Sequence, residues 1–510
     1  MRDSKKIGII ISYINLALNM VVSVFFTPFL ISSLGQVEYG VYRVVNSFAG
    51  QLSIMTFGMS TLVTRNIAFF DVKKDKKAKE NFLAMGLAIT LFLSAVAAIV
   101  GVVMYNNTGV IFKNSFTAEE IVTAKRLLLF MVANVAVIII NDFFAGFLTG
   151  HECFAYSNGA KTVSLILRIL TLVVLLKAGF KSVAIVATDF GLSLALLLFD
   201  MFYGLVVLNE KIKFHYFDKI MFKSSLLFSS AILLQAIINQ VNQNMDNLIL
   251  GIMTEASVVT VYSIGLVIYS TYNSIPTVIS SVFTPKATKM VAQNKGNDEL
   301  TDFVSSVGRY QLMFAGAILS GFILFGMEFI GLWLGEGYEA VYKITLVLIV
   351  PVTIPLVQNV CNSILDAQMK RMSRSVVLFV MAIVNVVVSV ILVKKIGYIG
   401  AAYGTSFATV VGHVVIMNVY YHKCIKLNVI KMFKDIFHRI LAVIAGVTLL
   451  CIPVRAINIH AFPWISFLLK CALFSVIYSA IMYIAGMNVS EKSMFKNMFK
   501  KFSNIFIREK

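Results

Sequence analysis

About fourteen apolar runs follow one another along this chain, and nearly every one is long enough to cross a bilayer. A spanning helix needs roughly 20 apolar residues to cover about 30 Å of hydrocarbon. A helix also satisfies its own backbone hydrogen bonds, which lipid cannot do. The sequence therefore predicts an all-α integral membrane protein with about 14 transmembrane helices. The runs lie at residues 7–32, 41–65, 81–105, 125–149, 161–178, 182–208, 225–250, 258–283, 303–334, 344–368, 376–393, 399–420, 440–458 and 464–487.

The amount and the distribution of charge agree with a membrane protein. Charged residues make up 14% of the chain, against about 25% in soluble domains. The net charge of +19 does not indicate a nucleic-acid partner, because roughly three quarters of the Lys and Arg fall in both tails and in the connectors on one side of the predicted bundle. This asymmetry predicts cytoplasmic N- and C-termini, and attraction to anionic membrane lipids accounts for the basicity.

The sequence lacks the motifs of a soluble enzyme, and we expect no catalytic residues, no cofactor and no metal site. There is no P-loop and no G-x-S-x-G, so this chain is not expected to be driven directly by ATP. The five cysteines and six histidines have no metal-ligand spacing. External connectors are short, whereas a membrane glycosyltransferase or polymerase would usually need a larger external loop. The pattern favours transport over catalysis.

Sparse similarity between residues 145–200 and 363–418 indicates an internal duplication. The segment beginning at Lys177 aligns with the segment beginning at Lys395, and helix number and loop side agree as well. Apolar composition alone could produce some of these identities. We predict two six-helix lobes, at residues 1–210 and 211–430, related by an axis along the membrane normal. Two further helices at 431–487 and a basic amphipathic cytoplasmic tail at 488–510 complete the predicted domains.

Three charged residues within predicted spans are candidates for ion coupling. Asp142, Arg168 and Asp200 each lie seven or eight residues from the cytoplasmic end of their apolar run, about 10–12 Å deep. A charge at such depth is costly, so it is a functional hypothesis by default. One interpretation is a switchable cluster that binds a proton or an anionic headgroup. The alternative is a permanent salt bridge within one lobe.

Polar stripes on three runs predict a water-filled cavity for a hydroxyl-rich ligand such as a sugar. Gln235, Asn239, Asn242 and Asp246 recur at helical spacing on the run 225–250. Amides and tyrosines bind such ligands by hydrogen bonds and ring stacking. The alternative is hydrogen bonding between helices, which is common for amides in membrane bundles. Further candidates are Asn15 and Asn19 on the first run, Tyr269 and Asn273 on the eighth, and Arg43, whose external position suits a phosphate.

The predicted 6 + 6 + 2 pattern resembles the polysaccharide transporter family. The motif that carries the resemblance runs from Leu34-Gly35 through Glu38-Tyr39-Gly40 to Val41-Tyr42, and Phe57-Gly58 and Arg65 fit the family's second helix. These are the Wzx-type flippases of the multidrug/oligosaccharidyl-lipid/polysaccharide exporter superfamily. The resemblance implies two lobes in a V, as in the multidrug exporters, around a cavity lined largely by helices one, two, seven and eight.

The resemblance also implies a function. Family members move an undecaprenyl-pyrophosphate-linked oligosaccharide across the bacterial cytoplasmic membrane for O-antigen, capsule or exopolysaccharide assembly. A polysaccharide polymerase and a chain-length regulator are the partners that this implies, and an H⁺ or Na⁺ gradient is the expected drive. Rival interpretations are a cation-coupled multidrug exporter or a lipid II flippase of the same superfamily. From another class, a membrane glycosyltransferase or polymerase stays open.

Overall fold

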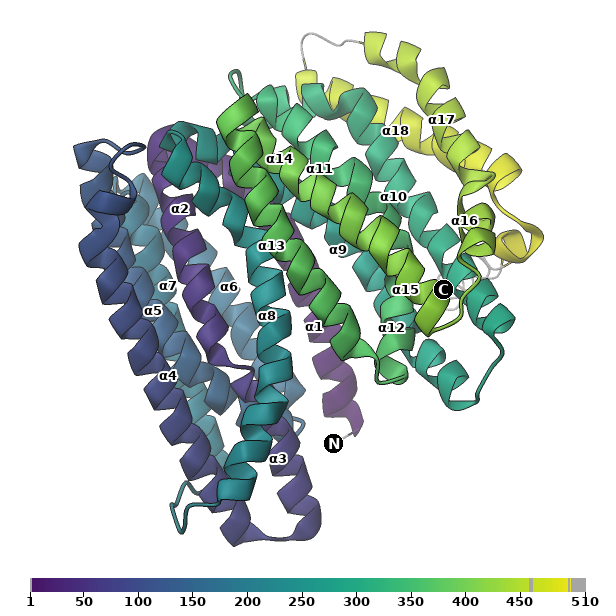
Figure 1. Cartoon of the computed structure of the whole chain (residues 1–510). Coiled ribbons are helices and arrows are strands. Elements are labelled where there is room, and N and C mark those ends of the chain that lie inside the picture. Colours follow the sequence, from purple (N-terminus) through teal and green to yellow (C-terminus); the bar gives the residue numbers. More distant parts are fainter. Residues whose placement is uncertain (1, 458–461, 494–495, 497–510) are drawn as a thin grey trace, which may run out of the picture. The chain divides into compact units, whose positions relative to one another are not determined.

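The computed structural model describes residues 2–457, 462–493 and 496. These residues form helices and no strand (Figure 1), which confirms the predicted all-α class. Twelve of the described helices are long and apolar enough to cross a membrane. The two other predicted windows differ from them. Window 41–65 is divided among α2 (Gln36–Leu52), the 3₁₀ helix η1 (Ser53–Thr56) and α3 (Met59–Lys73), and window 225–250 lies in α8 (Lys219–Met253).

The chain divides into two compact units, each described here by itself. Unit 1 comprises Met1–Val267 and Leu378–Thr405, and unit 2 comprises Ile268–Val377 and Ser406–Lys510. The helices α9 (Ala256–Ala292), α13 (Arg371–Ile396) and α14 (Ile399–Ala408) each contribute to both units. The lobes predicted at 1–210 and 211–430 stay a prediction. Most of the tail predicted at 488–510 lies outside the described residues.

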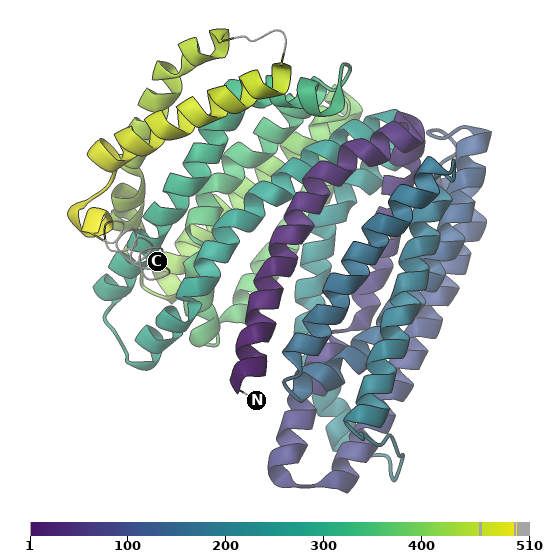
Figure 2. The same cartoon turned by 180° about the vertical axis from the view of Figure 1, so that it is seen from behind.

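Unit 1 is organised around α5 (Ala118–Gly150), which packs against α2, α3, α4 (Lys76–Ile111) and α7 (Ser182–Phe202). The helix begins with a capping box in which Thr117 and Glu120 satisfy each other's backbone N–H groups. Its buried face carries Phe143, Phe144 and Phe147, whose rings meet edge to face. Figure 2 shows α1 (Arg2–Leu34) beside α6 (Phe154–Lys177), with which it packs.

Unit 2 is organised around α10 (Asn297–Leu334), which packs against five shorter helices. An ion pair joins one of them to α10, because the buried Lys470 of α18 reaches both carboxylate oxygens of Glu328 on α10 at 2.8 and 2.9 Å. Figure 2 shows α18 in yellow, and it packs on α10. The five helices are α11 (Ala340–Val357), α12 (Asn359–Ala367), α16 (Val429–Phe437), α17 (Ile440–Leu450) and α18 (Pro463–Ile481).

Short helices of other types connect these elements, and four of them extend a longer helix. The π-helix η2 (Tyr203–Val207) continues α7, and η3 (Thr409–Ile416) joins α14 to α15 (Met417–Cys424). The 3₁₀ helix η4 (Ile452–Ala456) follows α17, and the π-helix η5 (Met482–Gly486) follows α18.

The motif between the first two predicted spans is a packing device in unit 1. Gly35 has a φ of +79° at the start of α2, a conformation that favours glycine. Glu38 accepts hydrogen bonds from Ser182 N at 2.8 Å and Ser182 Oγ at 2.6 Å, at the start of α7. A Cβ atom on Gly40 would lie 1.9 Å from the carbonyl oxygen of Ala256. The glycine therefore lets α2 and α9 touch along their backbones.

Replacing Gly40 with alanine is expected to lower the yield and the melting temperature of the purified protein. The added methyl would overlap a backbone carbonyl, which cannot rotate away, so α2 and α9 must separate. We expect a loss of about 1–3 kcal/mol or more in stability, measured as the midpoint of thermal unfolding in detergent. Gly159→Ala is the matched control, because its Cβ would meet no atom within 4 Å. Equal midpoints for the two variants would contradict this account of the motif.

Candidate functional site

A buried carboxylate surrounded by hydroxyl and amide groups lies within unit 1. Asp246 of α8 is 4% exposed. Its Oδ2 accepts hydrogen bonds from Tyr262 Oη at 2.5 Å and Thr405 Oγ1 at 2.8 Å. Among the described residues it has no Lys, Arg or His partner within 4.0 Å. Because an unpaired buried charge is costly, this carboxylate calls for a proton or a cation.

The oxygen atoms next to Asp246 extend the site onto α13 and α14. Thr405 Oγ1 also lies 3.3 Å from Asn385 Oδ1, which in turn accepts from Ser389 Oγ at 3.1 Å. A threonine hydroxyl has one hydrogen, so it donates to Asp246 or to Asn385 at any moment. A Cβ on Gly404 would clash with Ser389, and this glycine lets α14 approach α13 so closely. The result is a cluster of hard oxygen atoms, the ligand type that suits alkali and alkaline-earth cations.

The residues of the predicted amide stripe on α8 differ in burial: some are exposed and others are buried. Asn239 and Asn242 are exposed, and Gln235 donates along the helix to Asn239 Oδ1 at 3.0 Å. Asp246, by contrast, is buried in the cluster above. Its neighbour Asn247 is also buried, and its Nδ2 has no hydrogen-bond partner. The exposed amides stay candidates for sugar contact.

The second predicted span is broken, and polar side chains of other helices satisfy its ends. Phe57 and Gly58 both have positive φ between η1 and α3. Gln240 of α8 donates to the carbonyl of Gly50 and, at 3.0 Å, to Ser53 Oγ. Asp142 of α5 accepts the backbone N–H of Ser60 at 2.9 Å, in the first turn of α3. Asp142 thus caps a helix N-terminus, where a carboxylate is stabilised by the helix dipole.

Arg168 is paired with Asp189, and this differs from the expected cluster with Asp142 and Asp200. Its Nε and Nη2 donate to the two carboxylate oxygens of Asp189 at 2.5 and 3.0 Å. The reason is that α6 begins at Phe154, so Arg168 lies 14 residues, or about 21 Å, from that end. Asp142 is 8 residues, or about 12 Å, from the end of α5 at Gly150. Asp200 is buried on α7 and belongs to no ion pair among the described residues.

Arg43 of α2 is a half-buried guanidinium without an acidic partner among the residues that the structure describes. Its Nε is buried and has no hydrogen-bond partner, and it forms no ion pair with a described residue. Glu38, an acidic residue five positions earlier on the same helix, is bound to Ser182. The adjacent Tyr42 lies beside Arg168 and Asp189, which neutralise each other. Arg43 therefore keeps an uncompensated positive charge in this part of unit 1.

The other predicted cavity residues have different surroundings. Asn15 is used in helix packing, because its Nδ2 donates to Asn158 O at 3.0 Å and its Oδ1 accepts from Thr162 Oγ1 at 2.9 Å. Asn19 is exposed and donates to the backbone of its own helix. Tyr269 and Asn273 belong to unit 2, where both are half-buried and Tyr269 packs against the core around Tyr272.

A second buried acid, Glu210, was not among the predicted site residues. It accepts from His151 Nε2 at 2.6 Å and from Lys79 Nζ at 2.7 Å, and Lys79 also reaches Asp71 at 2.8 Å. Burial would raise the pKa of Glu210, but these hydrogen bonds and the charge of Lys79 hold it below its usual range. A lowered carboxyl pKa contributes stability at neutral pH, which is lost as the pH falls through that pKa. Glu210 therefore ties the α7–α8 connector to α4 and α5.

Asn385 and Thr405 were also missed from the sequence, although one signal was present. Asn385 is the only amide in the apolar run 376–393, and a lone amide among valines and isoleucines is costly unless it is bonded. Thr405 gave no such signal, because a threonine can bond the carbonyl of its own helix.

Comparisons with known proteins agree with this architecture. The family model described as polysaccharide biosynthesis protein matches residues 5–292. The chain is similar in fold to lipid II flippase MurJ in its inward closed conformation, with a TM-score of 0.62 and 17% identity over 91% of this chain and 99% of that chain. It is also similar to an inward-facing multidrug resistance MATE family transporter of the MOP superfamily, with a TM-score of 0.66 and 14% identity over 78% of this chain and 92% of that chain.

A further similar structure is a MATE protein in complex with MaD3S, with a TM-score of 0.51 and 14% identity over 81% of this chain and 95% of that chain. A search of curated proteins gives no significant match. At these identities the structural likeness concerns the fold.

Proposed function

Because this chain belongs to the polysaccharide biosynthesis protein family, we propose that it is a membrane transporter of the MOP superfamily and a flippase for an undecaprenyl-pyrophosphate-linked oligosaccharide. It would act in the bacterial cytoplasmic membrane, with both termini in the cytoplasm, and would deliver units to a polymerase and its chain-length regulator. The observation that carries this proposal is the uncompensated guanidinium of Arg43. An arginine without a carboxylate is suited to a doubly charged pyrophosphate, which it binds in a bidentate manner.

The exposed amides of α8 support the sugar part of this substrate. Asn239, Asn242 and Gln243 are exposed and carry no charge, so they can exchange hydrogen bonds with sugar hydroxyls without a large desolvation cost. A cationic drug would not be attracted by Arg43. The positive charge of Arg43 therefore favours an anionic lipid-linked oligosaccharide over a cationic drug as the substrate.

We propose Asp246 as the coupling residue, because it is buried and its described neighbours offer only hydroxyl and amide groups. A proton or a sodium ion would neutralise it, and the hydroxyl of Thr405 would turn from donor to ligand as the cation enters. Asp142 and Arg168 are less suited to coupling, since a helix N-terminus and Asp189 respectively already satisfy them.

Deleting the gene in its host and assaying lipid-linked oligosaccharide in each leaflet tests the proposal. Completed units trapped on the cytoplasmic side, with surface polysaccharide lost, are the expected result. Trapped lipid II would indicate a lipid II flippase, and sensitivity to cationic drugs with normal polysaccharide would indicate an exporter. Truncated units would indicate an enzyme.

Complementing that deletion with Arg43→Gln is expected to restore at most about a tenth of the export rate. A charge-assisted hydrogen bond is worth roughly 1.5–3 kcal/mol, or about 10- to 100-fold in affinity. Arg43→Lys keeps the charge but not the bidentate geometry, so its export rate should lie between those of the parent protein and Arg43→Gln. The control is Arg126→Gln, which removes an exposed arginine from α5. Full export by Arg43→Gln at normal expression would exclude Arg43 as the phosphate ligand.

A further inference from the structure

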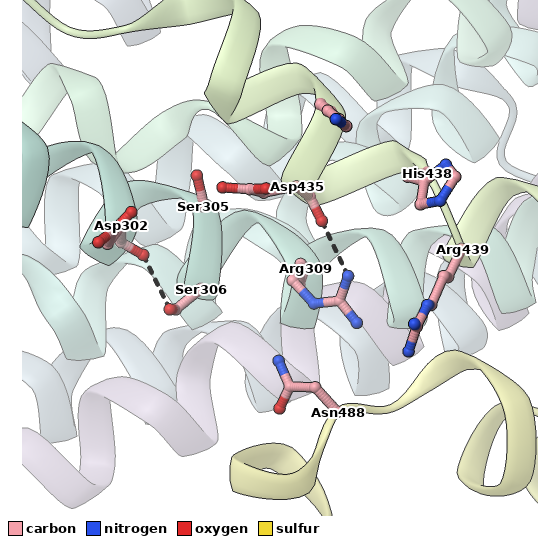
Figure 3. A pocket seen from close by; sticks show the side chains of 9 residues that line it. Asp302, Ser305, Ser306, Arg309, Asp435, His438, Arg439 and Asn488 are labelled. Atoms are coloured by element: carbon pink, nitrogen blue, oxygen red, sulfur yellow. Dashed lines mark hydrogen bonds between the residues drawn. The ribbon is translucent and has the colours of Figure 1, made fainter.

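Unit 2 contains a cavity of about 350 Å³ near the start of α10, and none of its lining residues is among those discussed for transport. This volume lies within the range of small-molecule sites, about 300–1,000 Å³. The cavity is bounded by α10, by α16 with the residues that follow it, and by the segment after α18 (Figure 3). Its lining residues are Asp302, Ser305, Ser306, Arg309, Lys434, Asp435, His438, Arg439 and Asn488.

The wall of this cavity is rigidly built around Arg309. Its Nε and Nη2 donate to Glu491 at 2.6 and 3.1 Å, Nη1 donates to Asp435 O at 2.8 Å and Nη2 to Gly486 O at 2.8 Å. Figure 3 shows Arg309 between Asp435 and Asn488. Four bonds from one guanidinium hold α10, α16 and the segment after α18 at fixed distances.

A buried hydroxyl in the wall has no hydrogen-bond partner among the described residues. Ser305 is 3% exposed and its Oγ makes no hydrogen bond with any described residue. A buried hydroxyl without a partner is uncommon in folded proteins and destabilises them. Asn488 uses Oδ1 to accept from Glu491 N at 2.9 Å, which leaves its Nδ2 as a donor. Both groups line the cavity, so its wall offers donors to a ligand.

The charge of the cavity is positive once its internal pairs cancel. Glu491 neutralises Arg309, and Lys431 neutralises Asp302 at 2.5 Å. Lys434 and Arg439 are exposed and form no ion pair with a described residue, whereas Asp435 supplies one negative charge. Donors together with a net positive charge fit a phosphate group.

Exposed apolar side chains on the same segments show what kind of phosphate compound fits. Ile430 and Val489 are 83% and 86% exposed, and Leu441 and Ile484 are exposed as well. Ile430 lies on α16, and Ile484 and Val489 lie in the segment after α18; both elements supply cavity lining. Leu441 lies on α17, which begins directly after the lining residue Arg439. Such side chains are stable beside acyl chains and unfavourable in water. A soluble phosphate would make no use of them.

We propose that this cavity binds the phosphate headgroup of an anionic phospholipid. The phosphate would accept hydrogen bonds from Ser305, Asn488, Lys434 and Arg439, and its acyl chains would lie along Ile430 and Val489 in the bilayer. Basic pockets between helices on the cytoplasmic side of membrane proteins suit such headgroups, and the positive-inside pattern of this chain predicts that side for the start of α10. The bound lipid would brace α10 against the two C-terminal spanning helices.

Native mass spectrometry of the full-length protein in detergent, titrated with phosphatidylglycerol, tests this inference. The double variant Lys434→Gln/Arg439→Gln is expected to bind the first lipid roughly 30-fold more weakly, since each basic residue contributes roughly fivefold to such binding. Ser305→Ala leaves the charge unchanged and should weaken binding severalfold. Transport is not needed for this measurement, so its outcome is independent of the proposed substrate.

The matched control is Lys423→Gln/Lys426→Gln, which removes the same charge from exposed positions outside the cavity. Equal lipid binding by the two double variants would overturn the proposal, because attraction would then come from the general surface charge. Phosphatidylcholine should bind far more weakly than phosphatidylglycerol to the parent protein. If glycerol 1-phosphate competed as well as the intact lipid, the ligand would be a soluble phosphate compound, and the lipid assignment would be wrong.

Discussion

Asp246→Asn is expected to reduce export at least 100-fold while leaving the protein folded. Asparagine has the same shape, and its Oδ1 can still accept a hydrogen bond from Tyr262 or Thr405. It cannot carry the negative charge that would attract a proton or a sodium ion. A transporter without its coupling residue loses the energy of the gradient, so export should fall nearly to the level of the gene deletion. The measurement is leaflet-resolved lipid-linked oligosaccharide in complemented cells.

Thr405 supplies a matched pair of controls for this prediction. Thr405→Ser keeps the hydroxyl and should retain most of the export activity. Thr405→Val keeps the shape but loses the oxygen next to Asp246, so its export activity should fall. In proteoliposomes the parent protein should respond to an imposed Na⁺ or pH gradient, and whichever gradient works identifies the ion. Undiminished export by Asp246→Asn, at normal expression, would show that coupling does not use this residue, while leaving the substrate assignment intact.

Arg309→Met is expected to destabilise unit 2 by about 3–5 kcal/mol, because it leaves a buried acid without its partner. Glu491 is 2% exposed and is bound by both Nε and Nη2 of Arg309. Removing the guanidinium also frees the carbonyls of Asp435 and Gly486. Equilibrium unfolding of the purified protein in mixed detergent micelles measures the loss.

The double variant Arg309→Met/Glu491→Met should recover much of that stability, since an apolar pair of similar volume avoids the desolvation of both charges. The control for an ordinary ion pair is Lys295→Met, whose partner Glu299 lies at 2.9 Å on the surface. Its loss should stay within about 0.5 kcal/mol. If Arg309→Met cost no more than Lys295→Met, the pair would not be what holds the C-terminal segment to α10.

The spans were predictable because burial in lipid places the same demand on every residue of a run. A helix that satisfies its own backbone and presents apolar side chains needs no information from distant residues. The broken second span shows the limit of this argument. Its window 41–65 is apolar enough to predict one continuous helix, yet Phe57 and Gly58 interrupt it. The break depends on Gln240 and Asp142, which lie on other helices and satisfy the freed backbone groups.

The candidate site divides in the same way. That Asp142, Arg168 and Asp200 were unusual followed from the cost of a charge in a membrane, and Asp246 was noticed as part of a polar stripe at helical spacing. Their partners did not follow from either observation. Arg168 meets Asp189 because α6 begins seven residues before the predicted run at 161, which changes the depth of every residue on it. The depth of a residue is estimated from the ends of its helix. Hydropathy does not locate those ends where the terminal residues of the helix are polar.

The sequence by itself determined the helical class and the membrane location, because period, hydropathy and charge asymmetry are local properties of a chain in a bilayer. The family followed separately, from the resemblance carried by the motif between the first two predicted spans. Only the tertiary structure decided which polar groups bond to neighbouring helices and which remain available to bind a ligand. Asn15, Gln240 and Asp142 bond to neighbouring helices, whereas Arg43 keeps an unsatisfied Nε. The physical reason is that a polar side chain in a membrane seeks a partner within reach, and reach is set by contacts between residues far apart in sequence.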